Sequence, residues 1–278
     1  MRFLLMEGIL NKMQTSLSPA GVAQYALPLG EQTLPLNDLI GKPLHLAYSG
    51  RIFCVACGRK TSKSFNQGYC FPCFKRLARC DICIVKPELC HFAQGTCREP
   101  EWALQFCFQP HIVYLANTSG LKVGITRQTQ IPTRWIDQGA TQALPVFRVK
   151  SRRAAGLLEV ALAQQIPDKT QWRTLLRGDG APLDLQAAKA EVMAQCEQVL
   201  ASVVLPEEDG VAERYEDAPE FSCKYPVLRY PEKIATLDFE KTATLGGTLE
   251  GIKGQYLIFD TGVINMRKFG GYEIAVGD

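Results

Sequence analysis

The 278-residue sequence predicts an α+β protein. Closely spaced cysteines fill residues 54–97, which is typical of a small metal-stabilised module. Apolar runs of strand length alternate with helical patterns between residues 111 and 166, and short apolar runs broken by glycines fill residues 221–276. We therefore expect a zinc-ribbon-like module, a small α/β core and a C-terminal antiparallel β domain.

These patterns divide the chain into four segments. They are N-terminal strands in residues 1–50, a cysteine-rich zinc module in 51–107, the core with additional helices in 108–205 and a small β domain in 221–278. In the first segment, the apolar runs Val22–Leu29 and Pro43–Tyr48 predict strands. These strands form a small sheet of their own or pack with a later part of the chain.

Eight cysteines are candidate metal ligands: Cys54, Cys57, Cys70, Cys73, Cys80, Cys83, Cys90 and Cys97. Three C-x2-C pairs occur among them, and each such loop lets two thiolates reach one ion. Gly58 allows the tight turn that directs backbone N–H groups at sulfur. We expect two structural zinc ions, with ligands grouped as consecutive fours or interleaved, and with His91 as an alternative to Cys90. Iron–sulfur and redox chemistry use the same thiolates.

Charge is unevenly distributed along the chain. Residues 50–160 contain 16 Lys and Arg against 6 Asp and Glu, whereas residues 161–278 contain 12 against 19. Between the cysteine pairs, basic side chains are interspersed with Phe65, Tyr69 and Phe71. Basic groups for phosphates and aromatic rings for bases indicate a nucleic-acid partner, DNA or RNA. The alternative is that the charges keep a small domain in solution and the aromatic rings form its core.

The stretch from residue 111 to 166 predicts a hairpin followed by a helix, a strand and a helix. Its first two apolar runs flank the connector Asn117–Gly120, which suits a β-hairpin. Ser151 is a suitable N-cap for the last helix. The predicted elements are the strands His111–Ala116 and Leu121–Thr126, a helix from Pro132 to Gly139, a strand at Val146–Val149 and a helix from Arg152 to about Ile166.

The remainder of the chain predicts one helix and six strands. Asp184 caps a helix that extends to about Val203 and has an apolar stripe for docking. The spacing of the strands favours a small barrel or curled sheet. The predicted strands are Val227–Tyr230, Ile234–Phe239, Ala243–Glu250, Gln255–Asp260, Val263–Arg267 and Tyr272–Val276.

Short motifs of the core occur in a recognisable order. Val113-Tyr114, Lys122-Val123-Gly124, Arg134 and Glu159 resemble the GIY-YIG nuclease superfamily, most closely its variants that read K-[IV]-G-x-T in the second motif. The wider chain also looks like an uncharacterised bacterial family of cysteine-rich proteins carrying this core. The resemblance covers about fifty residues and rests on short motifs.

The resemblance implies a site that cuts phosphodiesters with one divalent metal ion. Glu159 would hold Mg²⁺ or Mn²⁺, and Tyr114 would orient or deprotonate the attacking water. The charge that develops on the phosphate would be stabilised by Arg134, with Arg127 or Lys122. The first hypothesis is therefore a zinc-containing nucleic-acid-processing protein of the endonuclease type.

Departures from the motifs favour a second hypothesis. Ile112 occupies the position of the glycine in the first motif, and Lys122 that of the tyrosine in the second. The terminal asparagine of active members has no clear counterpart. These changes favour a non-catalytic RNA- or DNA-binding protein with a degenerate core. A third hypothesis is a protein-interaction scaffold that uses the acidic C-terminal half.

No targeting signal is evident in the sequence. No apolar run approaches the roughly 18 residues of a membrane span. Glu7 interrupts the apolar start of the chain, and a cleavage site of small residues is missing, which argues against a signal peptide. We therefore expect a cytoplasmic protein without a membrane partner.

Overall fold

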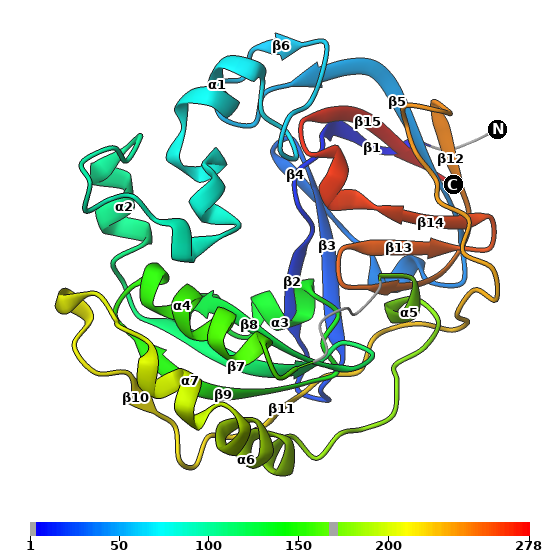
Figure 1. Ribbon diagram of the computed structural model, residues 1–278. Helices are drawn as coiled ribbons and strands as arrows, with labels where there is room; N and C mark the ends of the chain where they lie inside the picture. The colour runs from blue at the N-terminus through cyan, green and yellow to red at the C-terminus, as the bar shows by residue number, and fades with distance from the viewer. Residues whose placement is uncertain (1–3, 167–171) are drawn as a thin grey trace.

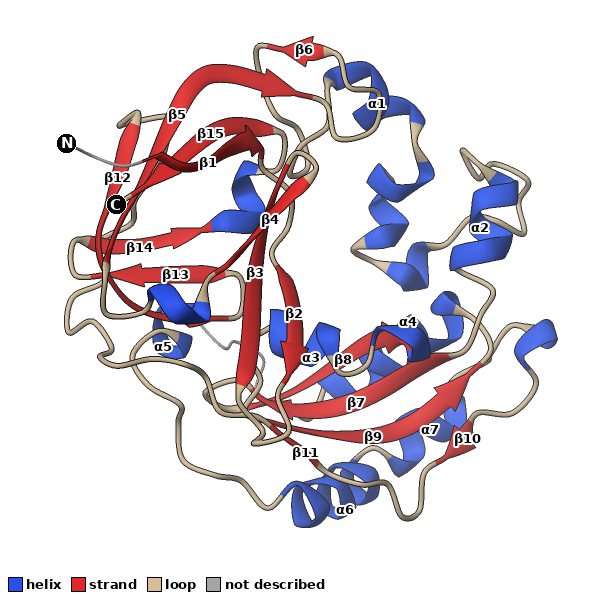
Figure 2. Ribbon diagram, turned by 180° about the vertical axis from the view of Figure 1, so that it is seen from behind, coloured by secondary structure: helices blue, strands red, loops and turns tan. Residues whose placement is uncertain are grey.

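The computed structural model describes residues 4–166 and 172–278 and contains three units (Figure 1). A β domain combines strands from both ends of the chain. The cysteine-rich segment and the core come between these strands in the sequence, and the core lies below the other two units in Figure 1. Figure 2 shows the same arrangement from behind, with the helices α1 (Phe71–Arg76) and α2 (Pro100–Phe106) confined to the cysteine-rich side. Among the described residues, no helix is long and apolar enough to cross a membrane.

The main sheet of the β domain joins the N-terminal and C-terminal segments. Its strand order is β1-β15-β5-β12-β13-β14, with the short β6 paired to β5. The bounds are β1 Leu4–Ile9, β5 Pro43–Phe53, β6 Lys60–Thr61, β12 Thr244–Lys253, β13 Tyr256–Phe259, β14 Gly262–Asn265 and β15 Tyr272–Gly277. Because β5 pairs with both β12 and β15, the N-terminal segment and residues 244–277 share one sheet, although they were predicted as separate segments.

A second, smaller sheet covers the inner face of the first. It contains β2 (Gln14–Leu17), β3 (Ala23–Leu29) and β4 (Gln32–Pro35) in that order. Alternate residues of β3, including Tyr25 and Leu27, are buried in the same apolar cluster as residues of the main sheet. The alternation is the pattern of a sheet with one face on a core.

Two of the predicted C-terminal strands are absent from the described structure. Val227–Tyr230 and Ile234–Phe239 each form only one isolated bridge, between Val227 and Gly251 and between Thr236 and Val263. Pro226 and Pro231 flank the first run and lack the N–H groups that a ladder requires. The other four predicted strands are present as β12 to β15, with shifted ends.

The core has the predicted order of elements. Its sheet runs β10-β9-β7-β8, with β11 also paired to β9, and β7 is buried along its whole length. Ser151 caps α4 as expected, because its Oγ accepts a hydrogen bond from the Ala154 N–H at 3.1 Å. The bounds are β7 His111–Asn117, β8 Leu121–Arg127, α3 Thr133–Asp137, β9 Gln142–Val149, α4 Arg152–Ala163, β10 Glu213–Arg214 and β11 Phe221–Ser222.

The predicted helix after Asp184 is divided in the structure. Asp184 caps α6 (Leu185–Gln195), but the helical conformation breaks at Cys196 and continues as α7 (Glu197–Ser202). Cys196 is wholly buried, with its thiol 3.9 Å from the Ala161 carbonyl oxygen of α4, so the break seats both helices on the core. The short helix α5 (Trp172–Leu175) precedes this region.

The cysteine-rich segment docks on the core through a close backbone contact. The 3-10 helix Pro87–Leu89 packs against α4 at Gly156. A Cβ atom at Gly156 would lie 2.6 Å from the Cβ of Pro87, so only glycine permits this approach. The contact holds one face of α4 beside the cysteine-rich segment.

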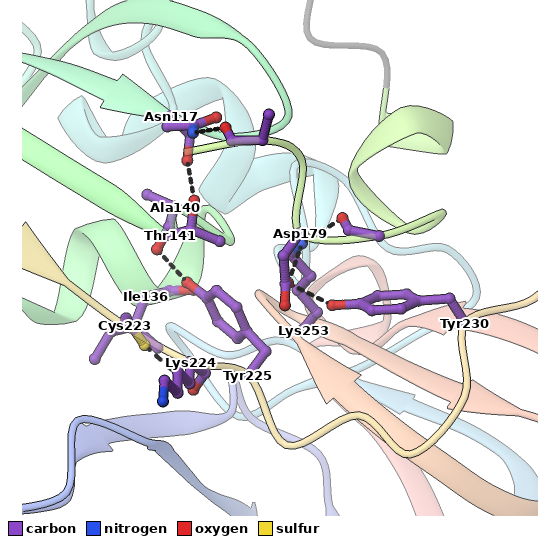
Figure 3. A network of polar contacts seen from close by, with 12 residues as sticks. Asn117, Ile136, Ala140, Thr141, Asp179, Cys223, Lys224, Tyr225, Tyr230 and Lys253 are labelled. Atoms are coloured by element: carbon purple, nitrogen blue, oxygen red, sulfur yellow. Dashed lines mark hydrogen bonds and ion pairs between the residues drawn. The ribbon is translucent and has the colours of Figure 1, made fainter. Parts of the chain in front are cut away.

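Polar contacts connect the core to the β domain (Figure 3). The hydroxyl of Tyr225 donates to the Ala140 carbonyl oxygen at 2.8 Å. The fully buried Nζ of Lys253 donates to the Gly178 carbonyl at 2.8 Å and to Asp179 at 2.9 Å, and it lies between the rings of Tyr225 and Tyr230. An amine that is paired and hydrogen-bonded in this way fixes the two units relative to each other.

Candidate functional site

The three units surround a cavity of about 650 Å³. The core contributes residues of β8, α3 and α4, the cysteine-rich segment contributes Arg79 and Val85, and the β domain side contributes Lys12 and Arg267. No unit forms the cavity by itself. Its shape therefore depends on the contacts at Gly156 and Lys253 that fix the units.

The cavity wall is strongly cationic. Seven of the described lining residues are lysine or arginine, and Glu159 is the one acidic residue among them. The cations are Lys12, Arg79, Lys122, Arg127, Arg134, Arg152 and Arg267. A concave surface with one sign of charge concentrates ligands of the opposite sign, so this wall favours anionic ligands over cationic ones.

Four of the five predicted core residues line this cavity. Lys122 and Arg127 lie on β8, Arg134 lies on α3, and Glu159 lies on α4, which packs against β8. Arg127 is held with its guanidinium carbon 5.2 Å from the centre of the Phe106 ring. The predicted motif residues thus converge although 37 positions separate the first from the last.

Glu159 has an unusual proton affinity. Burial raises its pKa to about 7, while the nearby charges of Arg134 and Arg152 act in the opposite direction. An ordinary glutamate is fully ionised at neutral pH, whereas Glu159 is about half protonated there. Strongly shifted groups in a cavity are typical of functional sites.

Tyr114, the fifth predicted residue, lies beneath the wall. Its side chain is fully buried and packs beside Gly124, where a Cβ would come within 2.8 Å of the hydroxyl. Burial raises the pKa of Tyr114 to about 12. Its hydroxyl lies 2.7 Å from the side-chain amide of Gln138. With the amide nitrogen facing Tyr114, the amide oxygen of Gln138 accepts a hydrogen bond from the Arg134 guanidinium at 3.0 Å. Tyr114 thus contacts the amide that holds Arg134 and is not among the residues that line the cavity.

Several residues of the cavity have little or no signal in the sequence. Arg152 lines the cavity and occupies the first turn of α4, where the helix dipole disfavours cations, and this was an available signal. The guanidinium of Arg152 donates to the Ile84 carbonyl oxygen of the cysteine-rich segment. Lys12 and Arg267 carry no local signal, because only the folding of distant strands brings them to the cavity.

Four cysteines form a cluster with the geometry of a metal site. The sulfur atoms of Cys54, Cys57, Cys70 and Cys73 all lie within 4.8 Å of one another. The sulfurs of Cys57 and Cys70 are 3.8 Å apart, which is the separation expected for tetrahedral ligands about 2.3 Å from one zinc ion. This cluster can bind zinc, and these are the first four cysteines of the predicted set.

Backbone N–H groups stabilise negative charge in this cluster. Burial opposes ionisation of Cys54, but N–H groups of Cys70, Cys57 and Ala56 lower its pKa to about 6. Gly58, with φ at +70°, makes the predicted tight turn. Burial and the neighbouring thiols raise the pKa of Cys73 to about 12. Four thiolates cannot form together here without a cation, and a divalent ion removes that conflict.

The other four predicted cysteines do not form one group. Cys80 packs in the apolar cluster around the first four. Cys83, Cys90 and Cys97 line a small separate cavity. The ligand atoms of Asp81, Cys83 and His91 lie within 4.8 Å of one another.

The chain belongs to the DUF2797 family, described as a protein of unknown function, whose model matches residues 41–274. The matched range includes all eleven cysteines and every cavity cation except Lys12. No curated protein and no solved structure matches the chain. The cavity and the cysteine cluster are therefore the basis for a functional assignment.

Proposed function

We propose that the cavity binds the sugar–phosphate backbone of a nucleic acid. The observation that carries the proposal is the convergence of Lys122, Arg127 and Arg134 with Glu159 in one cavity that is otherwise cationic. Phosphate groups at regular spacing are the polyanion that such a wall suits best, and phosphate contacts dominate nucleic-acid affinity.

The arginines of the wall are held by neutral partners. Arg127 lies against an aromatic ring, Arg134 bonds an amide, Arg152 bonds a carbonyl and Arg267 donates to the amide oxygen of Gln67 at 2.7 Å. These partners fix the guanidinium groups without cancelling their charge. Fixed donors lose less conformational entropy when a phosphate binds, which favours affinity.

A second function, metal-dependent cleavage of the bound strand, is favoured by Glu159. Mg²⁺ is commonly held by one or two carboxylates together with substrate phosphates, and Glu159 is the carboxylate that this wall offers. A cation there would polarise the phosphate and acidify a bound water. Arg134 and Arg127 would stabilise the developing charge, with Tyr114 acting only through Gln138. Because the wall is cationic, we expect the metal to bind tightly only with the strand.

Binding is tested by fluorescence anisotropy with single-stranded and duplex DNA and RNA across a salt series. Log affinity should fall linearly with log salt, and Arg134→Ala should lower the affinity about tenfold and the slope by about 0.7–0.9. Arg229→Ala is the matched control, because Arg229 is exposed and pairs with Glu250 outside the cavity. An affinity that does not change with salt would contradict a phosphate-led interaction.

Cleavage is tested on the same oligonucleotides with Mg²⁺ or Mn²⁺. Glu159→Ala should abolish cleavage and leave binding nearly intact, because the metal acts mainly on the transition state. Wild-type cleavage should increase as the pH rises through about 7, where Glu159 ionises. If the wild-type protein binds these strands but leaves all of them intact, the cleavage function is wrong and the binding function stands.

A further inference from the structure

A cysteine outside the predicted set lies beside three members of that set. Cys107 follows α2 directly and, with Cys83, Cys90 and Cys97, lines a cavity of about 20 Å³. The remaining wall is largely apolar and includes Phe92, Trp102 and Phe108. A space of this size accommodates one atom.

The four thiols of this cavity are close enough to affect one another. The thiols of Cys83 and Cys90 lie close enough to shift each other's pKa in opposite directions, Cys83 upward and Cys90 downward. Cys107 interacts electrostatically with Cys90 and Cys97. The four thiols line one small space and have the ligand type and number of a structural zinc site. Their sulfur atoms do not form a group within 4.8 Å of one another, so a bound ion would draw them closer together.

Cys80 belongs to different surroundings. It is buried in the cluster formed by Cys54, Cys70, Cys73 and Leu77. It is not among the residues that line the second cavity. The C-x2-C spacing of Cys80 and Cys83 therefore does not bring both thiols to the same ion.

We propose that Cys83, Cys90, Cys97 and Cys107 hold a second structural zinc ion. Four thiolates and one Zn²⁺ carry a net charge of −2, and Arg152, Arg153 and His91 lie near enough to interact with these thiols and offset it. The proposal is independent of the nucleic-acid function, because it concerns a closed site with no open position for substrate.

The neighbouring group of Asp81, Cys83 and His91 is a poorer ligand set. The Oδ2 atom of Asp81 accepts from Arg98 Nε at 2.6 Å, and its Oδ1 accepts from the Ile82 N–H at 2.6 Å. Nδ1 of His91 lies 2.8 Å from the Thr96 hydroxyl. These contacts already satisfy the carboxylate and orient the imidazole, so both side chains serve as supports around the ion.

The second ion would fasten the wall of the charged cavity to the core. The carbonyl oxygen of Cys107 accepts from the Arg152 N–H at 2.8 Å, at the start of α4. Ile84, next to Cys83, lines both cavities. A metal bound here therefore links the turn that carries Val85 and Pro87 to the connection that enters β7.

The first experiment measures zinc in the full-length chain and three serine variants by elemental analysis. Wild type, Cys80→Ser and Cys196→Ser should each contain two ions per chain, and Cys107→Ser should contain one. Cys196→Ser is the matched control, because Cys196 is buried away from both groups. Retention of two ions by Cys107→Ser, or loss of one by Cys80→Ser, would overturn the proposal.

The second experiment needs no substitution and so is unaffected by failure of a variant to fold. Wild-type protein is loaded with ¹¹³Cd, and couplings from each cadmium to cysteine β protons are recorded by NMR. The second resonance should couple to Cys83, Cys90, Cys97 and Cys107. Coupling to Cys80, coupling to the His91 ring, or the presence of a single cadmium resonance would each contradict the assignment.

Discussion

The four-cysteine cluster and the charged cavity differ in how far apart in the sequence their residues lie. The cluster uses Cys54 to Cys73, and local turns such as that at Gly58 place its sulfurs. The cavity uses residues from Asn11 to Gly270, and three packed units place them. They also differ in the charge of their side chains, because the cluster gathers thiols that become negative when they ionise and the cavity gathers positively charged side chains. A substitution in the cluster should therefore unfold the cysteine-rich segment, whereas a substitution in the cavity should lower the affinity for a ligand.

The largest expected effect comes from breaking the cluster. Cys57→Ser should lose one zinc ion and unfold the cysteine-rich segment, because zinc binding in such modules contributes about 10–16 kcal/mol of folding free energy. The measurements are zinc content and the thermal midpoint. Cys223→Ala, a buried cysteine outside both groups, is the control. If Cys57→Ser has the same zinc content and thermal midpoint as wild type, the four-cysteine cluster does not bind a structural zinc ion.

The next effect tests the dependence of the cavity on packing. Gly156→Ala should cost about 1–3 kcal/mol of unfolding free energy, because the new Cβ would come within 2.6 Å of Pro87. Gly178→Ala is the control, since a Cβ there would meet nothing within 4 Å. Denaturant unfolding gives the free energies. If both variants unfold alike, the contact between α4 and the cysteine-rich segment does not hold the cavity wall.

A third effect concerns the acid of the cavity. The pKa of Glu159 is about 7 in the folded chain and about 4.3 when unfolded. Between these values the unfolded state ionises first, so the free energy of unfolding should fall as pH rises from about 4 to about 7, by at most about 4 kcal/mol. Glu159→Gln lacks this contribution and should gain stability relative to wild type through that window. A parallel pH profile for the two proteins would contradict the shift, and exposed Glu101→Gln is the control.

The smallest effect separates two roles of Tyr114. Tyr114→Phe removes the hydroxyl beside Gln138 and should weaken polynucleotide binding by about 0.5–1.5 kcal/mol through a less ordered Arg134. In the Arg134→Ala background the same change should have almost no effect on binding. Loss of cleavage with binding unchanged would instead restore the expectation that Tyr114 activates water.

The sequence predicted the elements of the core and the first cysteine cluster because their signals are local. The apolar run of β7, the Ser151 cap and the C-x2-C loops each depend on residues a few positions apart. Lys122, Arg134 and Glu159 were predicted to meet because of the resemblance to an ordered set of motifs, and Arg127 because it directly follows Thr126; all four line one cavity.

Other features could not be read from local pattern. The sequence predicts β5, β12 and β15 as strands, but a strand pattern does not indicate which other strand pairs with it. Cys107 is isolated in the sequence and only the fold places it beside Cys90. Tyr114 has an ordinary strand position, and its depth beneath Gly124 follows from the packing of Trp135 against the sheet.

The central position of β5 has a consequence for synthesis. About 200 residues separate Ala47 from its partners Thr244 and Ala275, and ribosomes add about 5–20 residues per second. The strand therefore waits about 10–40 s for its neighbours, with Leu44 and Leu46 lacking the main sheet that later buries them. A temporary exposed edge of this kind is prone to aggregation, so slower induction at lower temperature or a co-expressed chaperone should raise the yield of intact protein.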